Sequence, residues 1–413
     1  MPGKKLRIAI LHLAFVYSGG GERLVLEEAK GLSDLGYEVT VFSPVVSAKD
    51  CYPTLLKKIP VRQIIPLLPR IIPERESFQI ILACLLAPVV AFQFKEFDII
   101  LAANQPSPWL AFWAKKIFGI PYISYLAQPT RFIYPRKVDQ ENGLIFVRRR
   151  LVSWATILLK ATKMVTKTLD IQSIRFSDRI LTNGGYIKRL IDRVYCIKSI
   201  SCPGGAYPSR KIPNYKIRKV GELRIAYGVI KKPYVLLTNR HFPQKRFEYA
   251  ITILPALIEV CPNIKLVITG RKTFYSQDLE KLIGKLGLGE KILFVNHVDE
   301  NELDRLYANA LAYLYTAPEE DFGMGIVEAM AHATPVVAWN NAGPKWIIKN
   351  GVTGFLAKTD DIRDYSSQVI KLLRDPVLAS KIGKGGYLSV VKKYNYETHF
   401  RTIEENIRKS LKP

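Results

Sequence analysis

Paired cysteines and metal-ligand clusters are absent from this sequence of 413 residues. Its five cysteines form no C-x-x-C pair and stand in no cluster with histidine. This argues against a disulfide-stapled domain and a zinc site, and it predicts a reduced, cytosolic chain. The basic start leads into an apolar run that Arg7 and His12 interrupt, and no small-residue cleavage pattern follows. We therefore expect a buried strand there and no secretory leader.

One apolar run approaches the length of a membrane span, which takes about 18 or more residues. It covers residues 77–94 and carries no charge, but Gln79, Pro88 and Gln93 interrupt it. We expect a core or interfacial helix, with a membrane span as the alternative. In a second segment, residues 148–167, arginine and lysine residues flank an apolar stripe. It predicts either a basic amphipathic helix at a membrane surface or an ordinary domain helix with a solvated face.

Acidic residues are in short supply, with 36 Asp and Glu against 61 Lys and Arg, and the net charge is +25. Such a surface attracts polyanions, which include nucleic acid, an anionic membrane and phosphorylated ligands. The basic residues are spread along the chain and form no tail or stripe interleaved with aromatics. That distribution argues against nucleic acid as the partner.

The length exceeds the ~250–300 residues at which one core usually divides, so we expect two domains. Strand-like and helical runs alternate in both halves, and a stretch rich in Pro, Gly and Ser separates them near residues 203–216. This places the first domain at residues 1–205 and the second at 206–389. The alternation predicts α/β domains with doubly wound parallel sheets, which bind ligands at the carboxyl ends of their strands, in a cleft. Helices of the second domain are expected at residues 245–260, 276–287, 300–309 and 324–333.

The stretch APEEDFGMGIVEAMAHATPVVAW holds two glutamates on either side of a glycine-bearing turn. Glu320 follows a predicted strand, and Glu328 lies about one turn into the next helix. The amides of Gly323, Met324 and Gly325 lie near the start of that helix, where unpaired N–H groups and the dipole favour a phosphate. Carboxylates accept hydrogen bonds from sugar or ribose hydroxyls. The alternative is a solvated loop charge at Glu320 and a helix-dipole partner at Glu328.

A second motif, LLTNRHFPQKRFEYAI, places two cations after a predicted strand. Arg240 ends the strand, and Lys245 opens the next helix five residues later. Both would then lie at the carboxyl end of the strand, where they could neutralise a diphosphate leaving group. A solvated basic rim is the alternative.

Two segments of the first domain also follow predicted strands. In SGGGERL, Gly20 and Gly21 precede a helix and would let a ligand approach the backbone, although a tight turn between strand and helix explains them equally well. The segment is not a G-x-G-x-x-G dinucleotide fingerprint. In YLAQPTRFIY, Gln128, Arg131 and Tyr134 are candidates to face the same ligand.

Together these motifs resemble the retaining glycosyltransferases of family 4, which have the GT-B fold. EEDFGMGIVEAMAHATPVVAW resembles the E-x7-E segment of that family, and NRHFPQK resembles its Arg-x4-Lys diphosphate clamp. The resemblance covers most of the chain in order and spacing. It implies two Rossmann-like domains facing a cleft, with the C-terminal helix at residues 390–413 crossing back to join the first domain.

The resemblance also implies a role for each candidate residue. Glu320 would contact the donor sugar, Glu328 the ribose, and Arg240 and Lys245 the diphosphate, with Arg240, Lys245 and Glu320 as the catalytic group. No metal is expected, since the family transfers sugar without one and the chain contains no D-x-D. The remaining contacts to the nucleotide-sugar would come from Gly20, Gly21, Asn296, Gly323, Met324 and Gly325, and the acceptor-side contacts from Gln128, Arg131 and Tyr134.

Three positions depart from the family pattern. Ala127 stands where many members have histidine, the segment AANQP lacks another histidine, and Gly184 replaces a common serine. The first two changes affect the acceptor side. Within the family, the first domain most resembles the Alg2-type mannosyltransferases that extend lipid-linked oligosaccharides. That implies a GDP-mannose donor, a lipid-linked or glycan acceptor, and a cytoplasmic enzyme bound peripherally to an anionic membrane.

Two other functions are compatible with the sequence. A family 4 enzyme could use a UDP-sugar on a soluble or cell-envelope acceptor. A polyanion-binding protein with a vestigial transferase fold would explain the net charge of +25. A nucleotide-specific stabilisation would favour an enzyme, whereas salt-sensitive stabilisation by duplex DNA would favour the polyanion binder.

Overall fold

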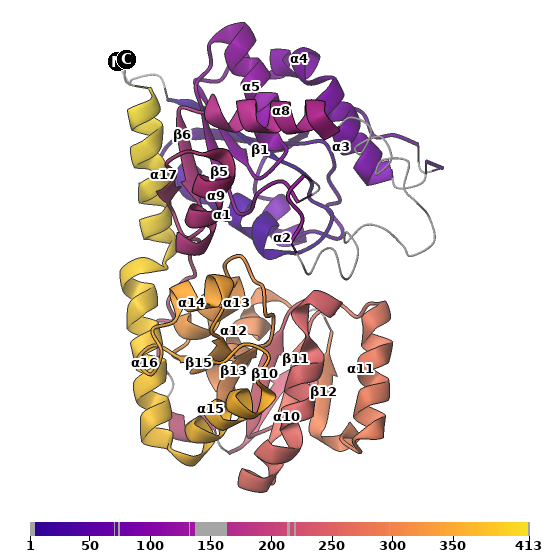
Figure 1. The fold of residues 1–413 in the computed structure, drawn as a ribbon, viewed down its shortest axis with the longest axis vertical. Coiled ribbons are helices and arrows are strands. Elements are labelled where there is room, and N and C mark those ends of the chain that lie inside the picture. Colours follow the sequence, from indigo (N-terminus) through magenta and orange to yellow (C-terminus); the bar gives the residue numbers. More distant parts are fainter. Residues whose placement is uncertain are drawn as a thin grey trace. The chain divides into compact units, whose positions relative to one another are not determined.

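The computed structural model describes residues 5–69, 71–72, 75–131, 133–136, 163–212, 215–218, 220–296 and 298–411 (Figure 1). It divides into two compact units, one of residues 1–204 with 396–413 and one of residues 205–395. The sequence places the corresponding boundaries at residue 205 and residue 390. Of the predicted basic segment 148–167, residues 148–162 lie outside the described part.

Unit 1 is built on a sheet of seven parallel strands in the order β3-β2-β1-β4-β5-β6-β7. Its central strands are continuous apolar runs, because helices cover both faces of the sheet and leave no face for polar side chains. The strands are β1 Arg7–His12, β2 Glu38–Ser43, β3 Val61–Gln63, β4 Ile99–Ala103, β5 Tyr122–Leu126, β6 Arg179–Thr182 and β7 Ile200–Ser201.

The helix α17 (Tyr396–Ser410) returns to unit 1 and packs on α1 (Gly20–Asp34). Gly31 permits this contact, because a Cβ there would lie 2.2 Å from the ring of Phe400. Deeper in the same interface, His399 Nε2 lies 3.0 Å from Glu28 Oε1, and both side chains are fully buried. Its Nδ1 lies 3.3 Å from the sulfur of Cys202. In the part of unit 1 that the structure describes, the other helical segments are α2 Pro53–Leu56, α3 Arg75–Leu85, α4 Ala87–Val90, η1 Ala91–Phe94, α5 Ser107–Phe118, α8 Lys163–Arg175 and α9 Gly185–Tyr195.

The predicted apolar helix at residues 77–94 is broken. It comprises α3, α4 and η1, with a bend of 75° between the helix that ends at Leu85 and the pair that starts at Ala87. Among the described residues, no individual helix has the length and apolar character to cross a membrane, and only this bent pair meets both criteria together. Gln79, within α3, is buried, and its side chain donates to the carbonyl of Pro66 and accepts from the amide of Leu68, so it is satisfied inside unit 1.

Unit 2 contains a second parallel sheet, of six strands in the order β12-β11-β10-β13-β14-β15. An antiparallel hairpin of β8 (Glu222–Ile225) and β9 (Gly228–Lys231) precedes it and is not anticipated by the sequence reasoning. The sheet strands are β10 Tyr234–Thr238, β11 Lys265–Thr269, β12 Ile292–Val295, β13 Ala312–Tyr315, β14 Val336–Trp339 and β15 Phe355–Ala357.

Four predicted helices of unit 2 are present, one with the predicted bounds of residues 300–309 and three with one or both ends shifted. The first is split into the 3-10 turn η3 (Pro243–Lys245) and α10 (Phe247–Val260), because Arg246 between them adopts a left-handed conformation with φ of 50°. The others are α11 Phe274–Lys285, α12 Glu300–Asn309 and α13 Met324–Ala331. The rest of the unit comprises η2 Tyr215–Arg218, η4 Gly289–Lys291, α14 Ala342–Ile347, α15 Ile362–Arg374 and α16 Pro376–Lys393.

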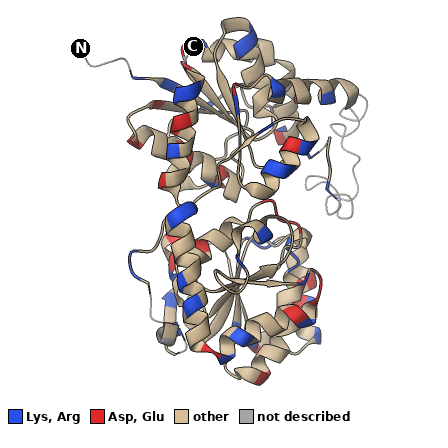
Figure 2. Cartoon of the chain, turned by 60° about the vertical axis from the view of Figure 1, so that its left-hand side comes forward, with Lys and Arg blue, Asp and Glu red and all other residues tan. Residues whose placement is uncertain are grey.

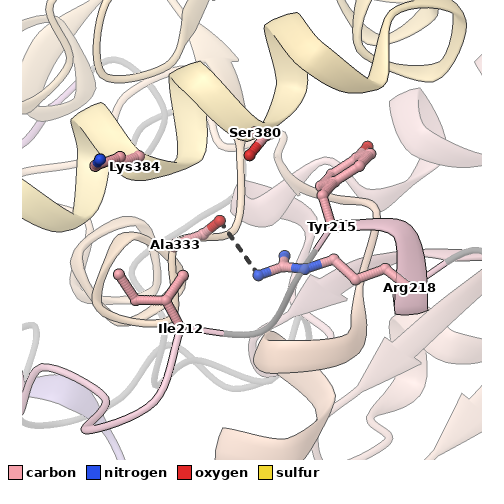
Figure 3. Close-up of a pocket in the computed structure, with 6 residues that line it drawn as sticks. All are labelled: Ile212, Tyr215, Arg218, Ala333, Ser380 and Lys384. Carbon is pink, nitrogen blue, oxygen red and sulfur yellow. Dashed lines mark hydrogen bonds between the residues drawn. The ribbon is translucent and has the colours of Figure 1, made fainter.

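Arg218, two residues after the predicted linker, is a buried arginine that joins two helix ends of unit 2. Arg218 donates to the carbonyls of Ala310 and His332, each at 2.9 Å, and to Thr334 Oγ1 at 2.8 Å. These groups follow α12 and α13, so one guanidinium fixes the ends of both helices. Burial lowers its pKa to about 10, which leaves it charged at neutral pH. Figure 3 shows Arg218 beside a small pocket whose lining also includes Tyr215 and Lys384.

Candidate active site

The candidate donor site lies at the carboxyl edge of the unit 2 sheet. β10 and β13 are neighbours at the centre of this sheet and run parallel. The loops that follow them therefore emerge at the same edge (Figure 1). Arg240 and Lys245 follow β10, whereas Glu320 and Gly323 follow β13, so Lys245 and Glu320, 75 positions apart in sequence, meet through the topology of the sheet.

An ion pair between Lys245 and Glu320 joins the two loops. The lysine ammonium donates to Glu320 Oε2, and the side chains are 23% and 19% exposed, so both groups border solvent. A second bond reinforces the contact, because Thr316 Oγ1 donates to the carbonyl of Lys245 at 2.7 Å. The ion pair and the Thr316 hydrogen bond together hold Lys245 next to Glu320.

The start of α14 holds the Glu320 loop from the other side. The amide of Gly343 donates to the carbonyl of Glu320 at 2.7 Å, and Asn341 Nδ2 donates to the carbonyl of Pro318 at 2.9 Å. A Cβ on Gly343 would lie 2.5 Å from the carbonyl oxygen of Phe322, so only glycine fits this approach. Because its main chain is fixed on both sides, the loop presents Glu320 in a defined position.

Glu328 is held by a cluster of buried hydroxyls that sequence reasoning missed. Tyr307, on α12, donates to Glu328 Oε2 at 2.9 Å. The Tyr307 hydroxyl also lies 3.0 Å from Thr238 Oγ1, which in turn lies 2.8 Å from the hydroxyl of Tyr313. Burial raises the pKa of Tyr307, and the Glu328 charge raises it further, so the phenol remains a proton donor. No sequence signal links these residues, because they come from four different elements.

Two glycines shape the backbone at the start of α13. Gly323 has φ of 105°, a left-handed conformation that L side chains rarely adopt. A Cβ on Gly325 would lie 2.3 Å from the hydroxyl of Tyr313. The first turn of α13, which begins at Met324, therefore rests directly on the tyrosine beneath it. The first N–H groups of a helix have no partner within that helix, so such an end suits an anion.

The remaining donor-side candidates lie along the same edge. Arg240 is half-buried, two residues beyond β10, with its guanidinium 5.2 Å from the ring centroid of Phe242. Asn296 is exposed and directly follows β12, the edge strand. Its carbonyl accepts from the amide of Gly270 at 3.4 Å, and a Cβ on Gly270 would lie 1.8 Å from the carbonyl oxygen of Asn239. The loop after β11, at Gly270, thus contacts both the loop after β10, at Asn239, and the loop after β12, at Asn296.

The unit 1 glycines lie at the corresponding edge of their own sheet. Gly20 and Gly21 are the first residues of α1. A Cβ on Gly21 would lie 3.9 Å from Nδ2 of Asn104, whose Oδ1 accepts from the amide of Ala127 at 2.9 Å. Asn104 therefore fixes the backbone at the position where Ala127 departs from the family pattern. The last residue of β1, His12, is also buried here, and burial lowers its pKa to about 4, which keeps it neutral.

The three acceptor-side candidates have different surroundings. Arg131 Nε donates to Gln128 Oε1, so these two side chains contact each other and are both partly exposed. Tyr134 instead stacks edge-on against Tyr195, with centroids 5.8 Å apart, and its hydroxyl is buried with no hydrogen-bond partner among the described residues. Burial, with the nearby charge of Asp170, raises the Tyr134 pKa. The hydroxyl of Tyr134 therefore belongs to the interior of unit 1.

Two family models match the chain in succession. The model for Glycosyltransferase Family 4 matches residues 18–201, and the model for Glycosyl transferases group 1 matches residues 223–389. Two Rossmann-like units that carry these matches define a glycosyltransferase of the GT-B fold. The chain belongs to the group 1 and family 4 glycosyltransferases.

Similar proteins agree with this assignment. The chain is 24% identical to the human alpha-1,3/1,6-mannosyltransferase ALG2, over 95% of this chain and 94% of that protein. It is 28% identical to the GDP-mannose-dependent alpha-(1-6)-phosphatidylinositol monomannoside mannosyltransferase of Mycolicibacterium smegmatis, over 49% of this chain and 54% of that protein. The fold is similar to that of HepE from Anabaena, solved with UDP and glucose, with a TM-score of 0.71, 19% identity, and 98% and 100% of the two chains covered.

Proposed function

We propose that the chain transfers mannose from GDP-mannose, with retention of anomeric configuration, onto a lipid-linked oligosaccharide or similar glycan at a membrane surface. One observation carries the proposal. At the carboxyl edge of the unit 2 sheet, Lys245 pairs with Glu320, and Tyr307 donates a hydrogen bond to Glu328. The mannosyltransferase names of the human and mycobacterial relatives support the choice of sugar. The name of the mycobacterial relative also supports GDP-mannose as the donor and a lipid as the acceptor.

The transfer requires two bonds to change. The bond between the anomeric carbon and the diphosphate oxygen breaks, and the acceptor oxygen bonds to the same carbon while its hydroxyl proton passes to the departing diphosphate oxygen. The departing GDP gains negative charge, which Arg240 and Lys245 are placed to stabilise. The first turn of α13 adds the positive end of a helix dipole. On this proposal Glu320 accepts hydrogen bonds from the sugar, Glu328 from the ribose, and Asn296 lies beside the base.

We also propose that the reaction needs no metal ion. Two side-chain cations and a helix N-terminus at one edge can supply the charge stabilisation that Mg²⁺ provides elsewhere. On the acceptor side we assign Gln128 and Arg131, which are partly exposed, and we assign Gly20 and Gly21 to the nucleotide-sugar. Activity should persist in excess EDTA, and a requirement for added Mg²⁺ or Mn²⁺ would remove this part of the proposal.

A nucleotide titration distinguishes the proposed donor from the alternatives. GDP at about 100 times its Kd should raise the free energy of unfolding by ~2.7 kcal/mol, followed as a rise in Tm. A larger shift with UDP would favour a UDP-sugar donor, the ligand class seen in the HepE structure. A shift with duplex DNA alone, lost in moderate salt, would favour the polyanion binder suggested by the charge of +25. Product analysis of GDP-mannose incubated with lipid-linked acceptors, including the anomeric configuration, then tests the transfer.

A further inference from the structure

An apolar surface that contains no candidate site residue lies on the helices of unit 1. It begins where α3 meets α4, with Leu85, Leu86 and Val89, and continues to Phe92 on η1. Val89 is 67% exposed and Phe92 58%, values far above those of the buried residues on the same turns, such as Val90 and Ala91. Large apolar side chains gathered in this way on a soluble surface indicate an interaction site.

The apolar surface continues from η1 across α5 to the end of α8. The ring of Phe92 packs edge-on against Phe118, 5.0 Å between centroids, and Phe112 packs in the same way on Phe176, at 5.6 Å. These contacts link α4, η1, α5 and α8, which lie together at the top of Figure 1. We call this surface the α4–α8 face, defined by Leu85, Leu86, Val89, Phe92, Ile117 and Phe176.

Exposed cations outnumber exposed acids on and beside the helices of the α4–α8 face. Lys115 and Lys116 lie in the last turn of α5, whereas Lys167 and Arg175 are exposed on α8, where Arg175 Nε donates to the carbonyl of Tyr195 at 3.1 Å. The sequences of α4, η1, α5 and α8 contain a single acid, Asp170, which is fully buried and accepts from Thr130 and Tyr195. Asp178, just beyond α8, pairs with Lys115 at 2.7 Å. The Lys116 ammonium lies 4.3 Å from the Phe176 centroid, so a basic and an apolar group are in contact here. Figure 2 shows the Lys and Arg positions of the chain in blue and its Asp and Glu positions in red.

We propose that the α4–α8 face docks unit 1 on an anionic lipid bilayer. Val89 and Phe92 enter the interface between headgroups and acyl chains, while Lys116, Lys167 and Arg175 contact headgroup phosphates. The inference rests on the proposed function, because it locates the membrane contact which a lipid-linked acceptor requires. It differs from a membrane-spanning arrangement, since the helix pair is bent by 75° and Gln79 bonds inside the unit.

The positive charge of the α4–α8 face favours an anionic lipid bilayer as its partner over a second copy of the chain. A twofold dimer through this surface would place the same cations opposite one another, and no exposed acid on these helices would offset them. An anionic bilayer complements both features, with phosphate for the cations and acyl chains for the apolar side chains. Each Lys or Arg near such a surface contributes attraction that salt screens.

The test uses the full chain and vesicles of phosphatidylcholine with about one third phosphatidylglycerol. The double variant Val89→Ser, Phe92→Ser should bind these vesicles at least ~10-fold more weakly than the wild type. The control, Val377→Ser with Leu388→Ser, removes apolar groups of similar exposure from α16 of unit 2 and should bind as the wild type does. Circular dichroism and Tm establish that both variants are folded. Replacing Lys116, Lys167 and Arg175 with Gln should flatten the salt dependence.

Several outcomes would overturn the inference. Undiminished vesicle binding by the Val89, Phe92 variant would place the membrane contact elsewhere. Equal binding to pure phosphatidylcholine would remove the role of the cations. Loss of self-association in sedimentation velocity, without vesicle binding by the wild type, would assign the face to a second copy. Binding is measured without nucleotide or acceptor, so a failure here leaves the transferase proposal intact, and a failed GDP titration leaves the vesicle result intact.

Discussion

Lys245 and Glu320 form an ion pair across the two central loops of unit 2. A diphosphate would compete with Glu320 for the lysine ammonium, so the pair couples donor binding to the position of the acid. Glu320→Gln should therefore tighten GDP binding roughly 3- to 10-fold, because it removes a competing charge worth about 1 kcal/mol. The same change should lower turnover, since the sugar loses its carboxylate. Isothermal titration with GDP and a steady-state assay measure the two effects.

A double-mutant cycle supplies the control for this pair. Lys245→Ala and Glu320→Ala should show a coupling in the free energy of unfolding, while the exposed pair Lys272 and Glu280 of the same unit should show a smaller one. GDP affinity that falls in Glu320→Gln would mean that the carboxylate supports the nucleotide instead of competing with it.

Arg240 is expected to act on the leaving group. Arg240→Ala should lower kcat by ~10²–10³, as for the loss of one charge-stabilising donor, and leave the Tm close to that of the wild type. The matched control is Arg363→Ala on α15, an exposed arginine of the same unit. Unchanged turnover in Arg240→Ala would restrict this residue to the rim of the site.

Tyr307 is expected to set the affinity for the nucleotide through Glu328. Tyr307→Phe removes the 2.9 Å bond to the carboxylate and keeps the ring, so GDP binding should weaken by roughly 10- to 150-fold, because a hydrogen bond to a charged group contributes about 1.5–3 kcal/mol. Tyr234→Phe is the control, because its equally buried hydroxyl donates to the backbone carbonyl of Leu306. It should lower stability and leave GDP affinity unaffected. Equal effects of both variants on affinity would contradict a positioning role.

Gly325 is expected to tolerate no side chain. Gly325→Ala places a methyl group 2.3 Å from the hydroxyl of Tyr313, so the free energy of unfolding should fall by about 1–3 kcal/mol, the cost of overpacking. In the helix α11, Gly284→Ala meets nothing within 4 Å and should stabilise by about 0.5–1 kcal/mol. Adding Tyr313→Phe to Gly325→Ala should recover part of the loss. Urea denaturation measures all three.

His399 is expected to make stability depend on alkaline pH. Burial alone would lower its pKa, but the contacts with Cys202 and Glu28 raise it to about 10 from 6.5. The folded state thus keeps a proton that the unfolded state releases, so this contribution is complete below pH 6.5 and is lost as the pH rises toward 10. The free energy of unfolding should fall between pH 7 and 9.5 with a slope approaching ~1.4 kcal/mol per pH unit. His399→Gln should lack this slope, and an identical slope in the variant would assign it to other groups.

The sequence predicts the local features of this fold well and the tertiary contacts poorly. Apolar runs such as RIAILH and YVLLT identify buried parallel strands, because a strand covered on both faces needs no polar positions. The sequence alone identifies four candidate site residues, because each belongs to a motif that is a short continuous stretch of sequence: Arg240, Lys245, Glu320 and Glu328. The Tyr307 and Asn104 contacts could not, since each depends on which strands become neighbours. The β8–β9 hairpin was missed because its residues alternate only briefly around Tyr227.

Because α17 is the last helix of the chain and belongs to unit 1, it constrains the order in which the two units can fold during synthesis. The ribosome synthesises the chain from the N-terminus at about 5–20 residues per second. All of unit 2, residues 205–395, is therefore made before His399. Unit 2 is continuous in sequence and can fold while unit 1 still lacks one of its helices. Until α17 arrives, Gly31 and the carboxyl group of Glu28 lie on an uncovered surface of the nascent protein, so the order of synthesis makes the first half of the polypeptide the last to be completed.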